Sequence, residues 1–293
     1  TKAQAAPLLF DTVQNQPEYS ALNDGDAVLV GGTNPWLASS GSAGTVKIAK
    51  TGHRHTRSTA HYKSLGGGQV VLENPYAPGS SSPPDTIRTL YVSWWQKFSV
   101  SPYELTNNAS HKFIRVWNGG NDDLRVSWTQ HQLFVTNTNA GGSSAITNDY
   151  TTDHWSAGSW HKHELWVDGD TGVVQAWVNG TPVGSISNAA TTHLCDPTYP
   201  SGLRVSLIGF DPANGTAEKF DLTYDMDDVW IDATRQRFVI ANSATWASAT
   251  IREDQPATAW ATGEVTVTAN FGALDPSATC YLHCVSIAGT SEY

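Results

Sequence analysis

Apolar and polar residues alternate with a period of two along most of this 293-residue chain, and this pattern predicts half-buried β-strands. The densest example is the segment 90–100, where Leu90 and Val92 share one face and Tyr91, Trp95 and Lys97 share the other. The first face is expected to fill a core. Aromatic residues beside a lysine on the second face favour a partner, such as a sugar ring, a peptide or another subunit.

The same pattern predicts further strands, which turn residues separate. They are expected at residues 8–12, 45–50, 56–63, 69–73, 88–100, 112–117, 124–136, 159–168, 173–179, 203–210 and 220–232. The pair Asn179-Gly180 predicts a type I′ hairpin turn. Residues 137–144 are expected to be a loop, because Asn, Thr and Gly leave no apolar pattern there.

The pattern changes after Arg235. Residues 1–235 are predicted to form a β-sandwich, and residues 236–293 a small β appendage of three or four strands. The composition favours the same all-β class, since 25 Gly, 14 Pro, 12 Trp and a single Met suit a chain of many strands and tight turns.

Charge narrows the choice of partners. The formal net charge of −10 argues against nucleic acid, because phosphate binding needs an excess of Lys and Arg. The distribution is uneven, however: Lys47 to Lys63 holds five Lys or Arg and no acid, whereas Asp211 to Asp232 is mostly acidic. An acidic ligand would bind to the first segment and a cation to the second. No apolar run approaches the length of a membrane span.

Cysteines and glycosylation sequons bear on the location of the protein. Cys280 and Cys284 are four residues apart, too far for a disulfide if both lie on one strand, so at most one of them pairs with Cys195. Sequons begin at Asn108, Asn179 and Asn214. Together with a chain start that looks like a processed product, the sequons favour an extracellular or surface-exposed protein, either secreted or virion-associated.

Six segments carry a resemblance to a known family. They are Tyr91-Val-Ser-Trp-Trp95, Lys112-Phe-Ile-Arg-Val-Trp117, Arg125-Val-Ser-Trp-Thr-Gln130, Trp160-His-Lys-His-Glu-Leu-Trp-Val-Asp168, Val178-Asn-Gly180 and Met226-Asp-Asp-Val-Trp-Ile-Asp232. Their succession resembles concanavalin A-like jelly rolls, in the laminin G-like and polysaccharide-lyase-like branch, over roughly residues 8–235. The resemblance implies two antiparallel sheets with ligands across a concave face. It is specific for architecture only, because this fold carries lectins, hydrolases, lyases and structural modules.

The main functional expectation is a lectin-like protein that binds a polysaccharide or another glycan. Aromatic rings stack on the apolar faces of sugars, and polar neighbours bind the hydroxyl groups. The ligand-binding residues expected on the concave face are Tyr91, Trp95, Lys97, Arg115, Trp117, Arg125 and His131.

A polysaccharide lyase that acts on uronate-containing glycans by β-elimination is the alternative if the chain is an enzyme. Arg57 or Arg115 would neutralise the uronate carboxylate, and His131 or Tyr62 would move the proton. Glycoside hydrolysis is disfavoured, since the chain has no Glu-x-Asp-x-Glu strand of the kind that hydrolases of this fold share.

A third alternative is a structural subunit of a virion, an extracellular filament or a cell surface, which would self-assemble through exposed aromatic residues. Calcium is the one cofactor that the sequence indicates. Its expected ligands are Asp225, Asp227 and Asp228, because calcium takes carboxylate oxygens from loops.

Overall fold

The computed structural model describes residues 8–15, 19–30, 34–36, 38–40, 45–64, 70–73, 87–105, 111–117, 124–137, 144–150, 152–187, 202–212, 222–261, 264–289 and 291–292. These residues form strands and three single-turn 3₁₀ helices but no α-helix. The chain is therefore all-β, as the alternation predicts. The 3₁₀ helices are η1 (Tyr19–Ala21), η2 (Pro102–Glu104) and η3 (Trp246–Ser248).

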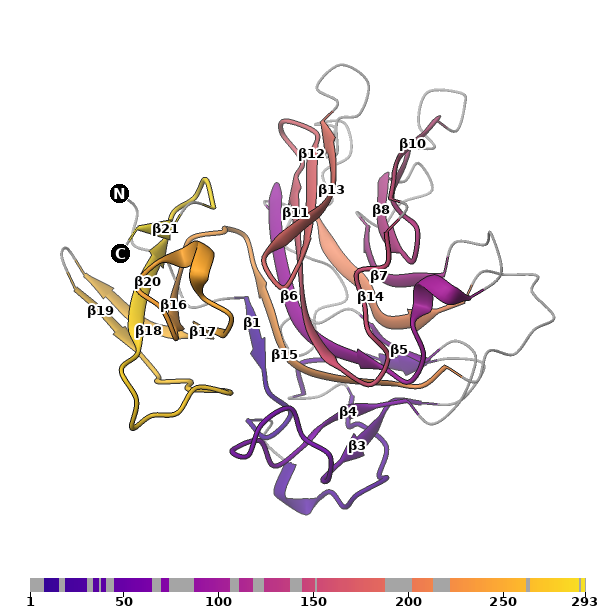
Figure 1. Cartoon of the computed structure of the whole chain (residues 1–293). Helices are drawn as coiled ribbons and strands as arrows, with labels where there is room; N and C mark the ends of the chain where they lie inside the picture. The colour runs from indigo at the N-terminus through magenta and orange to yellow at the C-terminus, as the bar shows by residue number, and fades with distance from the viewer. Residues whose placement is uncertain are drawn as a thin grey trace.

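The larger part of the molecule is a sandwich of two antiparallel sheets (Figure 1). Sheet A has the order β13-β12-β11-β6-β15-β4-β3, and β1 also pairs with β15. Its strands are β1 (Leu9–Asp11), β3 (Lys47–Ala49), β4 (His61–Lys63), β6 (Thr89–Phe98), β11 (Trp160–Asp168), β12 (Val173–Val178), β13 (Thr181–Ser187) and β15 (Tyr224–Asp232).

Sheet B has the order β10-β9-β8-β7-β14-β5-β2. Its strands are β2 (Ala38–Ser40), β5 (Val70–Glu73), β7 (Lys112–Trp117), β8 (Leu124–Thr129), β9 (Gln132–Asn137), β10 (Ser144–Asp149) and β14 (Arg204–Asp211). In Figure 1 the long strands β6 and β15 bend around sheet B, which lies on the inner side of the bend.

The core lies between the two sheets and has the composition that the alternation predicts. Leu90, Val92 and Trp94 of β6 are fully buried, and Trp94 packs edge-on against Trp128 of β8 with ring centroids 5.7 Å apart. His163 of β11 stacks on Trp94 at 5.1 Å. Burial is the main reason that the pKa of His163 is lowered to about 3, so this histidine is neutral in the core.

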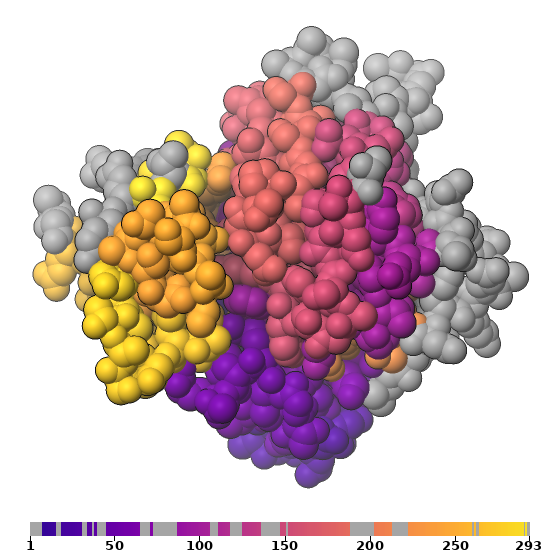
Figure 2. Space-filling view, viewed as in Figure 1, coloured from indigo at the N-terminus to yellow at the C-terminus, as the bar shows by residue number. Residues whose placement is uncertain are grey.

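Strands after Arg235 form sheets of their own. Sheet C has the order β17-β16-β20-β21, and sheet D is the pair β18-β19. The strands are β16 (Arg237–Ala241), β17 (Arg252–Gln255), β18 (Ala257–Ala261), β19 (Glu264–Val267), β20 (Tyr281–Val285) and β21 (Ser291–Glu292). We call residues 236–293 the C-terminal lobe. Figure 2 shows it, in orange and yellow, beside the sandwich.

The structure contains the turn predicted at Asn179-Gly180 but differs from two other local predictions. Asn179 and Gly180 have φ angles of 50° and 77°, as a type I′ turn requires. The strand expected at 124–136 is instead two strands, β8 and β9, with a turn at Gln130 and His131. The loop expected at 137–144 ends where β10 begins, and the sequence pattern did not predict β10. Cys195, Asn108 and Asn214 lie outside the described residues.

No helix in the described ranges is long and apolar enough to cross a membrane.

Candidate functional site

The ligand-binding residues expected on one concave face belong to two different sheets. Tyr91, Trp95 and Lys97 lie on β6 of sheet A, whereas Arg115 and Trp117 lie on β7 of sheet B. The strands β6 and β7 are consecutive in the chain but do not pair with each other. Strand β6 pairs with β11 and β15, whereas β7 pairs with β8 and β14. The predicted single face is therefore wrong, because these residues lie on two different sheets.

The sheet A half lies largely beneath the C-terminal lobe. Tyr91 is 1% exposed; its hydroxyl donates to Glu164 at 2.6 Å, and the guanidinium of Arg237 lies over its ring at 4.3 Å. Trp95 is covered by the guanidinium of Arg54 at 4.4 Å. These two aromatic residues are thus part of an internal interface and do not form an open platform for a sugar.

Buried ion pairs join the sandwich to the C-terminal lobe. Three pairs cross from one part to the other: Lys162–Asp254 (2.6 Å), Arg237–Glu164 (2.8 Å) and Arg54–Glu253 (2.7 Å). The network also includes Arg237–Asp254 (2.8 Å) within the lobe and Arg54–Asp228 within the sandwich. Every side chain in these pairs is at most 12% exposed. Burial alone would raise the pKa of Asp254, but Lys162 and Arg237 outweigh it and lower that pKa to about 2. The network is therefore charged at neutral pH.

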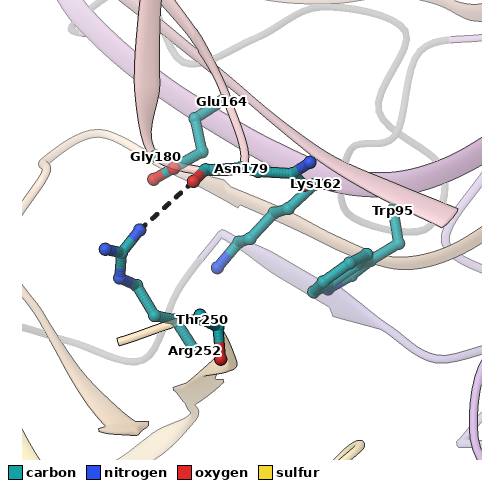
Figure 3. Close-up of a pocket in the computed structure, with 7 residues that line it drawn as sticks. All are labelled: Trp95, Lys162, Glu164, Asn179, Gly180, Thr250 and Arg252. Carbon is teal, nitrogen blue, oxygen red and sulfur yellow. Dashed lines mark hydrogen bonds between the residues drawn. The ribbon is translucent and has the colours of Figure 1, made fainter. Parts of the chain in front are cut away.

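A small recess lies within this interface (Figure 3). It is lined by Trp95, Lys162, Glu164, Asn179, Gly180, Thr250 and Arg252. Arg252 donates to the carbonyl oxygen of Asn179 across it at 3.4 Å. Its volume of about 20 Å³ has room for a water molecule but not for a sugar ring. The recess is consequently part of the interface and not a ligand pocket.

The three aspartates expected to bind calcium point to separate partners. The partners are Lys97 and His61 for Asp225, the Ser58 hydroxyl for Asp227, and Arg54 for Asp228. Asp228 lies at a bulge of β15 and has a φ of 47°. Within the described part of the chain, no three His, Cys, Asp or Glu side chains are grouped to hold a metal ion. The predicted ligand set is not formed, and calcium binding stays a prediction.

The residues expected to catalyse β-elimination are also dispersed. Tyr62 is fully buried and bonds to Asp11 in the interior; burial first, and then Asp11, raise its pKa well above the ordinary value. Arg57 donates to the carbonyl oxygen of Gly272 in the C-terminal lobe at 2.6 Å. Arg115 and His131 belong to sheet B and its β8–β9 turn. Among the described residues, no hydrogen bond or ion pair joins a cation of this set to one of its proposed bases, and lyase activity stays a prediction.

The sheet B half does form a coherent surface on its outer side. Trp117 of β7 lies opposite Arg125 of β8 and Arg204 of β14 in the strand register. The guanidinium carbons lie 5.0 Å and 6.0 Å from the centre of the indole, one from each neighbouring strand. Cross-strand neighbours share one face of a sheet, so the indole stands between two cations.

Two more cations continue this surface along β7. Lys112 and Arg115 lie near a single carboxylate, that of Asp211, at 3.5 Å and 3.8 Å. Burial lowers the pKa of both cations; Asp211 opposes this shift, and nearby guanidinium groups add to it. The side chains of Lys112 and Arg115 are 18% and 21% exposed. We call Lys112, Arg115, Trp117, Arg125 and Arg204 the basic-aromatic face.

Two donors on this face have no hydrogen-bond partner among the described residues. They are the buried Nε1 of Trp117 and Nε of Arg115. A buried donor without an acceptor costs free energy, so the face is suited to a ligand that carries acceptor oxygens. His131 lies at the β8–β9 turn of the same sheet, where its ring packs against Tyr103 with centroids 4.7 Å apart.

Sequence reasoning found Arg115, Trp117 and Arg125 but missed Lys112 and Arg204. Lys112 begins a strand that the pattern predicts, and a bulge after it places Lys112 opposite Thr129. Arg204 is far from Trp117 in the sequence and meets it only because β14 pairs with β7. No local signal could have shown this pairing.

Comparisons with known proteins give little beyond the fold. No family model matches the sequence, and no curated protein is similar enough to count as a relative. Among solved structures, the binding domain of botulinum neurotoxin DC, solved in complex with rat synaptotagmin II, is 13% identical over 69% of this chain and 44% of that chain, with a TM-score of 0.41. The cellulose-induced protein Cip1 is 16% identical over 67% of this chain and 91% of that chain, with a TM-score of 0.43.

A third similar structure is the binding domain of Paraclostridial Mosquitocidal Protein 1, which is 14% identical over 67% of this chain and 44% of that chain, with a TM-score of 0.40. The chain thus spans less than half of the length of the two toxin domains that it matches. TM-scores and identities this low carry no argument about the ligand of this protein.

Proposed function

We propose that this chain is a carbohydrate-binding protein that holds an acidic glycan on the basic-aromatic face. The observation that supports this most is the position of Trp117 between the guanidinium groups of Arg125 and Arg204. An aromatic ring flanked by two cations provides both kinds of contact that a sugar acid needs. The ring packs against the C–H groups of the pyranose, and the guanidinium groups bind its carboxylate or sulfate through paired hydrogen bonds.

Electrostatics favours an acidic glycan over a neutral one. Lys112 and Arg115 carry charges that partial burial already disfavours, and an anion on this face would compensate them. The overall charge of −10 repels polyanions at long range. Only the cations of this face attract the glycan, and the field of the whole protein does not speed its association. We accordingly expect moderate affinity that falls as salt is added.

The experiment is titration calorimetry of the full chain with a polyuronate tetrasaccharide and, for comparison, with cellotetraose. Replacement of Trp117 by Ala, or of Arg125 by Gln, should weaken binding of the uronate by about tenfold or more, since buried Trp and Arg contacts contribute the most to such interfaces. Cellotetraose should bind more weakly than the uronate, and added salt should weaken only the binding of the uronate.

The matched control is Trp246→Ala. Trp246 lies in η3 of the C-terminal lobe, is half-buried like Trp117, and also carries a guanidinium over its ring, that of Arg252 at 4.6 Å. Its replacement should leave the affinity unchanged. Equal losses in the Trp117 and Trp246 variants, or unchanged affinity in the Trp117 variant, would remove the proposal.

We also propose an extracellular or surface-exposed location, because acidic polysaccharides are mostly extracellular polymers. A lyase activity and assembly into a larger structure stay predictions, and each has its own readout. Unsaturated uronate products would absorb in the ultraviolet, and a structural subunit would associate with itself.

A further inference from the structure

The basic segment between Lys47 and Lys63 contains a second set of cations, none of which belongs to the basic-aromatic face. Two of its cations hold the C-terminal lobe: Arg54 pairs with Glu253, and Arg57 donates to backbone carbonyls there. The remaining lysines at both ends of the segment lie on β3 and β4. They therefore belong to sheet A, on the opposite side of the sandwich from Trp117.

These lysines begin a row that runs straight across five strands of sheet A. In the strand register each residue lies opposite the next, in the order Lys47, Lys63, Asp225, Lys97 and Trp160. We call this set the lysine row. Opposite residues share a face of the sheet, and adjacent strands lie about 4.8 Å apart, so the row is about 19 Å long.

The lysine row lies just beyond the area that the C-terminal lobe contacts. Lys162, two residues from Trp160 on β11, pairs with Asp254 of the lobe. Trp95, two residues from Lys97 on β6, lies under Arg54, which pairs with Glu253 of the lobe. No hydrogen bond or ion pair joins the lysine row to the lobe among the described residues. The side chain of Lys97 is 22% exposed, and Trp160 is half-buried.

Charge along the row is only partly compensated. Asp225 pairs with Lys97 at 2.6 Å and with His61 at 3.1 Å. Lys47 and Lys63 form no ion pair with any carboxylate in the described ranges. At the other end of the row, Lys97 lies 5.0 Å from the centre of the Trp160 ring. The row thus combines two lysines that form no ion pair among the described residues with an aromatic ring that lies beside Lys97.

We propose that the lysine row is a second binding site for an anionic saccharide, separate from the basic-aromatic face. Trp160 would pack against one sugar ring, while Lys47 and Lys63 would bind carboxylate or sulfate groups further along the chain. The strand spacing of about 4.8 Å is similar to the length of one sugar unit in an extended polysaccharide, so successive acidic groups can meet successive strands. Two sites on opposite sides of one sandwich would let a single protein link two polysaccharide chains.

The test is titration calorimetry of the full chain with a tetra-uronate and with a sulfated tetrasaccharide as the two probes. The wild-type protein should bind at two sites. An Arg125→Gln/Arg204→Gln variant should keep one of them, and adding Lys47→Gln/Lys63→Gln should weaken that remaining site by about tenfold or more.

The matched control removes the same charge elsewhere. Lys50 lies over the ring of Tyr19 at 4.7 Å, and Arg88 pairs with the exposed Asp170 near the start of β6, so neither belongs to the row. Lys50→Gln/Arg88→Gln in the same background should change the affinity by less than about twofold. Trp160→Ala should also weaken the second site without reducing binding at the first.

The outcomes separate this inference from the proposed function. Loss of binding in the Lys47→Gln/Lys63→Gln variant alone, with no effect of the arginine variants, would support the lysine row and remove the basic-aromatic face. The inference is overturned if the wild-type protein binds only at a site that the arginine variants abolish. It is equally overturned if the control variant loses as much affinity as the lysine variant, or if neither probe binds.

Discussion

Both outer faces of the sandwich carry aromatic rings beside arginine side chains, but one face forms an internal interface and the other a candidate binding surface. On sheet A, the rings of Tyr91 and Trp95 lie under the guanidinium groups of Arg237 and Arg54, and carboxylates of the C-terminal lobe neutralise those cations. On sheet B, Trp117 also carries guanidinium groups, but they come from strands of its own sheet. A pairing of arginine with an aromatic ring is thus no sign of ligand binding by itself.

The two faces differ in how far their charged side chains are buried. The Arg237 and Asp254 side chains are 4% and 6% exposed, whereas Lys112 and Arg115 are 18% and 21% exposed. Buried pairs of this kind hold their partners in one arrangement, because removing one member leaves a buried charge. Partly exposed cations can exchange water for a ligand. Burial and charge balance, more than residue type, therefore separate an internal interface from a binding surface.

The largest effect is expected at Asp254, the carboxylate between Lys162 and Arg237. Asp254→Ala leaves Lys162 buried without its counter-ion and leaves Arg237 with Glu164 alone, so it should lower the free energy of unfolding by about 3–5 kcal/mol. The matched control is Asp170→Ala, because Asp170 pairs with Arg88 but is 58% exposed. That change should cost less than about 1 kcal/mol. Denaturant unfolding measures both, and similar costs would show that the interface is no more than a surface contact.

A smaller effect is expected from acid. The folded pKa of Asp254 is about 2, below the ordinary value of 3.8, so its ionised form stabilises the fold above pH 4 and this contribution is lost as the pH falls towards 2. The shift corresponds to about 2 kcal/mol. The difference in unfolding free energy between wild type and Asp254→Asn should shrink by that amount between pH 5 and pH 2, and other titrating groups cancel in the difference. A constant difference would mean that Asp254 is not held ionised.

The sequence predicts the strands of these faces much better than it predicts which face is covered and which can bind a ligand. Period-two alternation indicates correctly that Leu90 and Trp94 are buried, and the Asn179-Gly180 pair marks a turn that the structure has. Alternation divides each strand into two faces, but it cannot tell which outer face another part of the chain will cover. Tyr91 and Trp117 look equivalent in the sequence for this reason.

Pairing of strands distant in the sequence sets a second limit. Arg204 reaches Trp117, and Lys63 reaches Lys97 through Asp225, only because of the order of strands within each sheet. Consecutive strands such as β6 and β7 fall in different sheets, so candidate residues that are near in sequence lie on opposite sides of the sandwich. A bulge such as that at Asp228, with its φ of 47°, also changes the direction of side chains after it.

The smallest effect on stability is expected at Trp117, on the outer face of sheet B. Trp117→Ala should lower the free energy of unfolding by less than about 1 kcal/mol, since Arg125 and Arg204 are half-buried and can move into the space. Trp95→Ala should cost about 2 kcal/mol, because it leaves a cavity beneath Arg54, whose side chain is 2% exposed and fixed by two carboxylates. The two variants should differ in the opposite sense in ligand affinity, because only Trp117→Ala should lose binding of the acidic glycan. Equal stability costs for the two variants would mean that the outer face of sheet B is as closed as that of sheet A, and the distinction between interface and binding surface would fail.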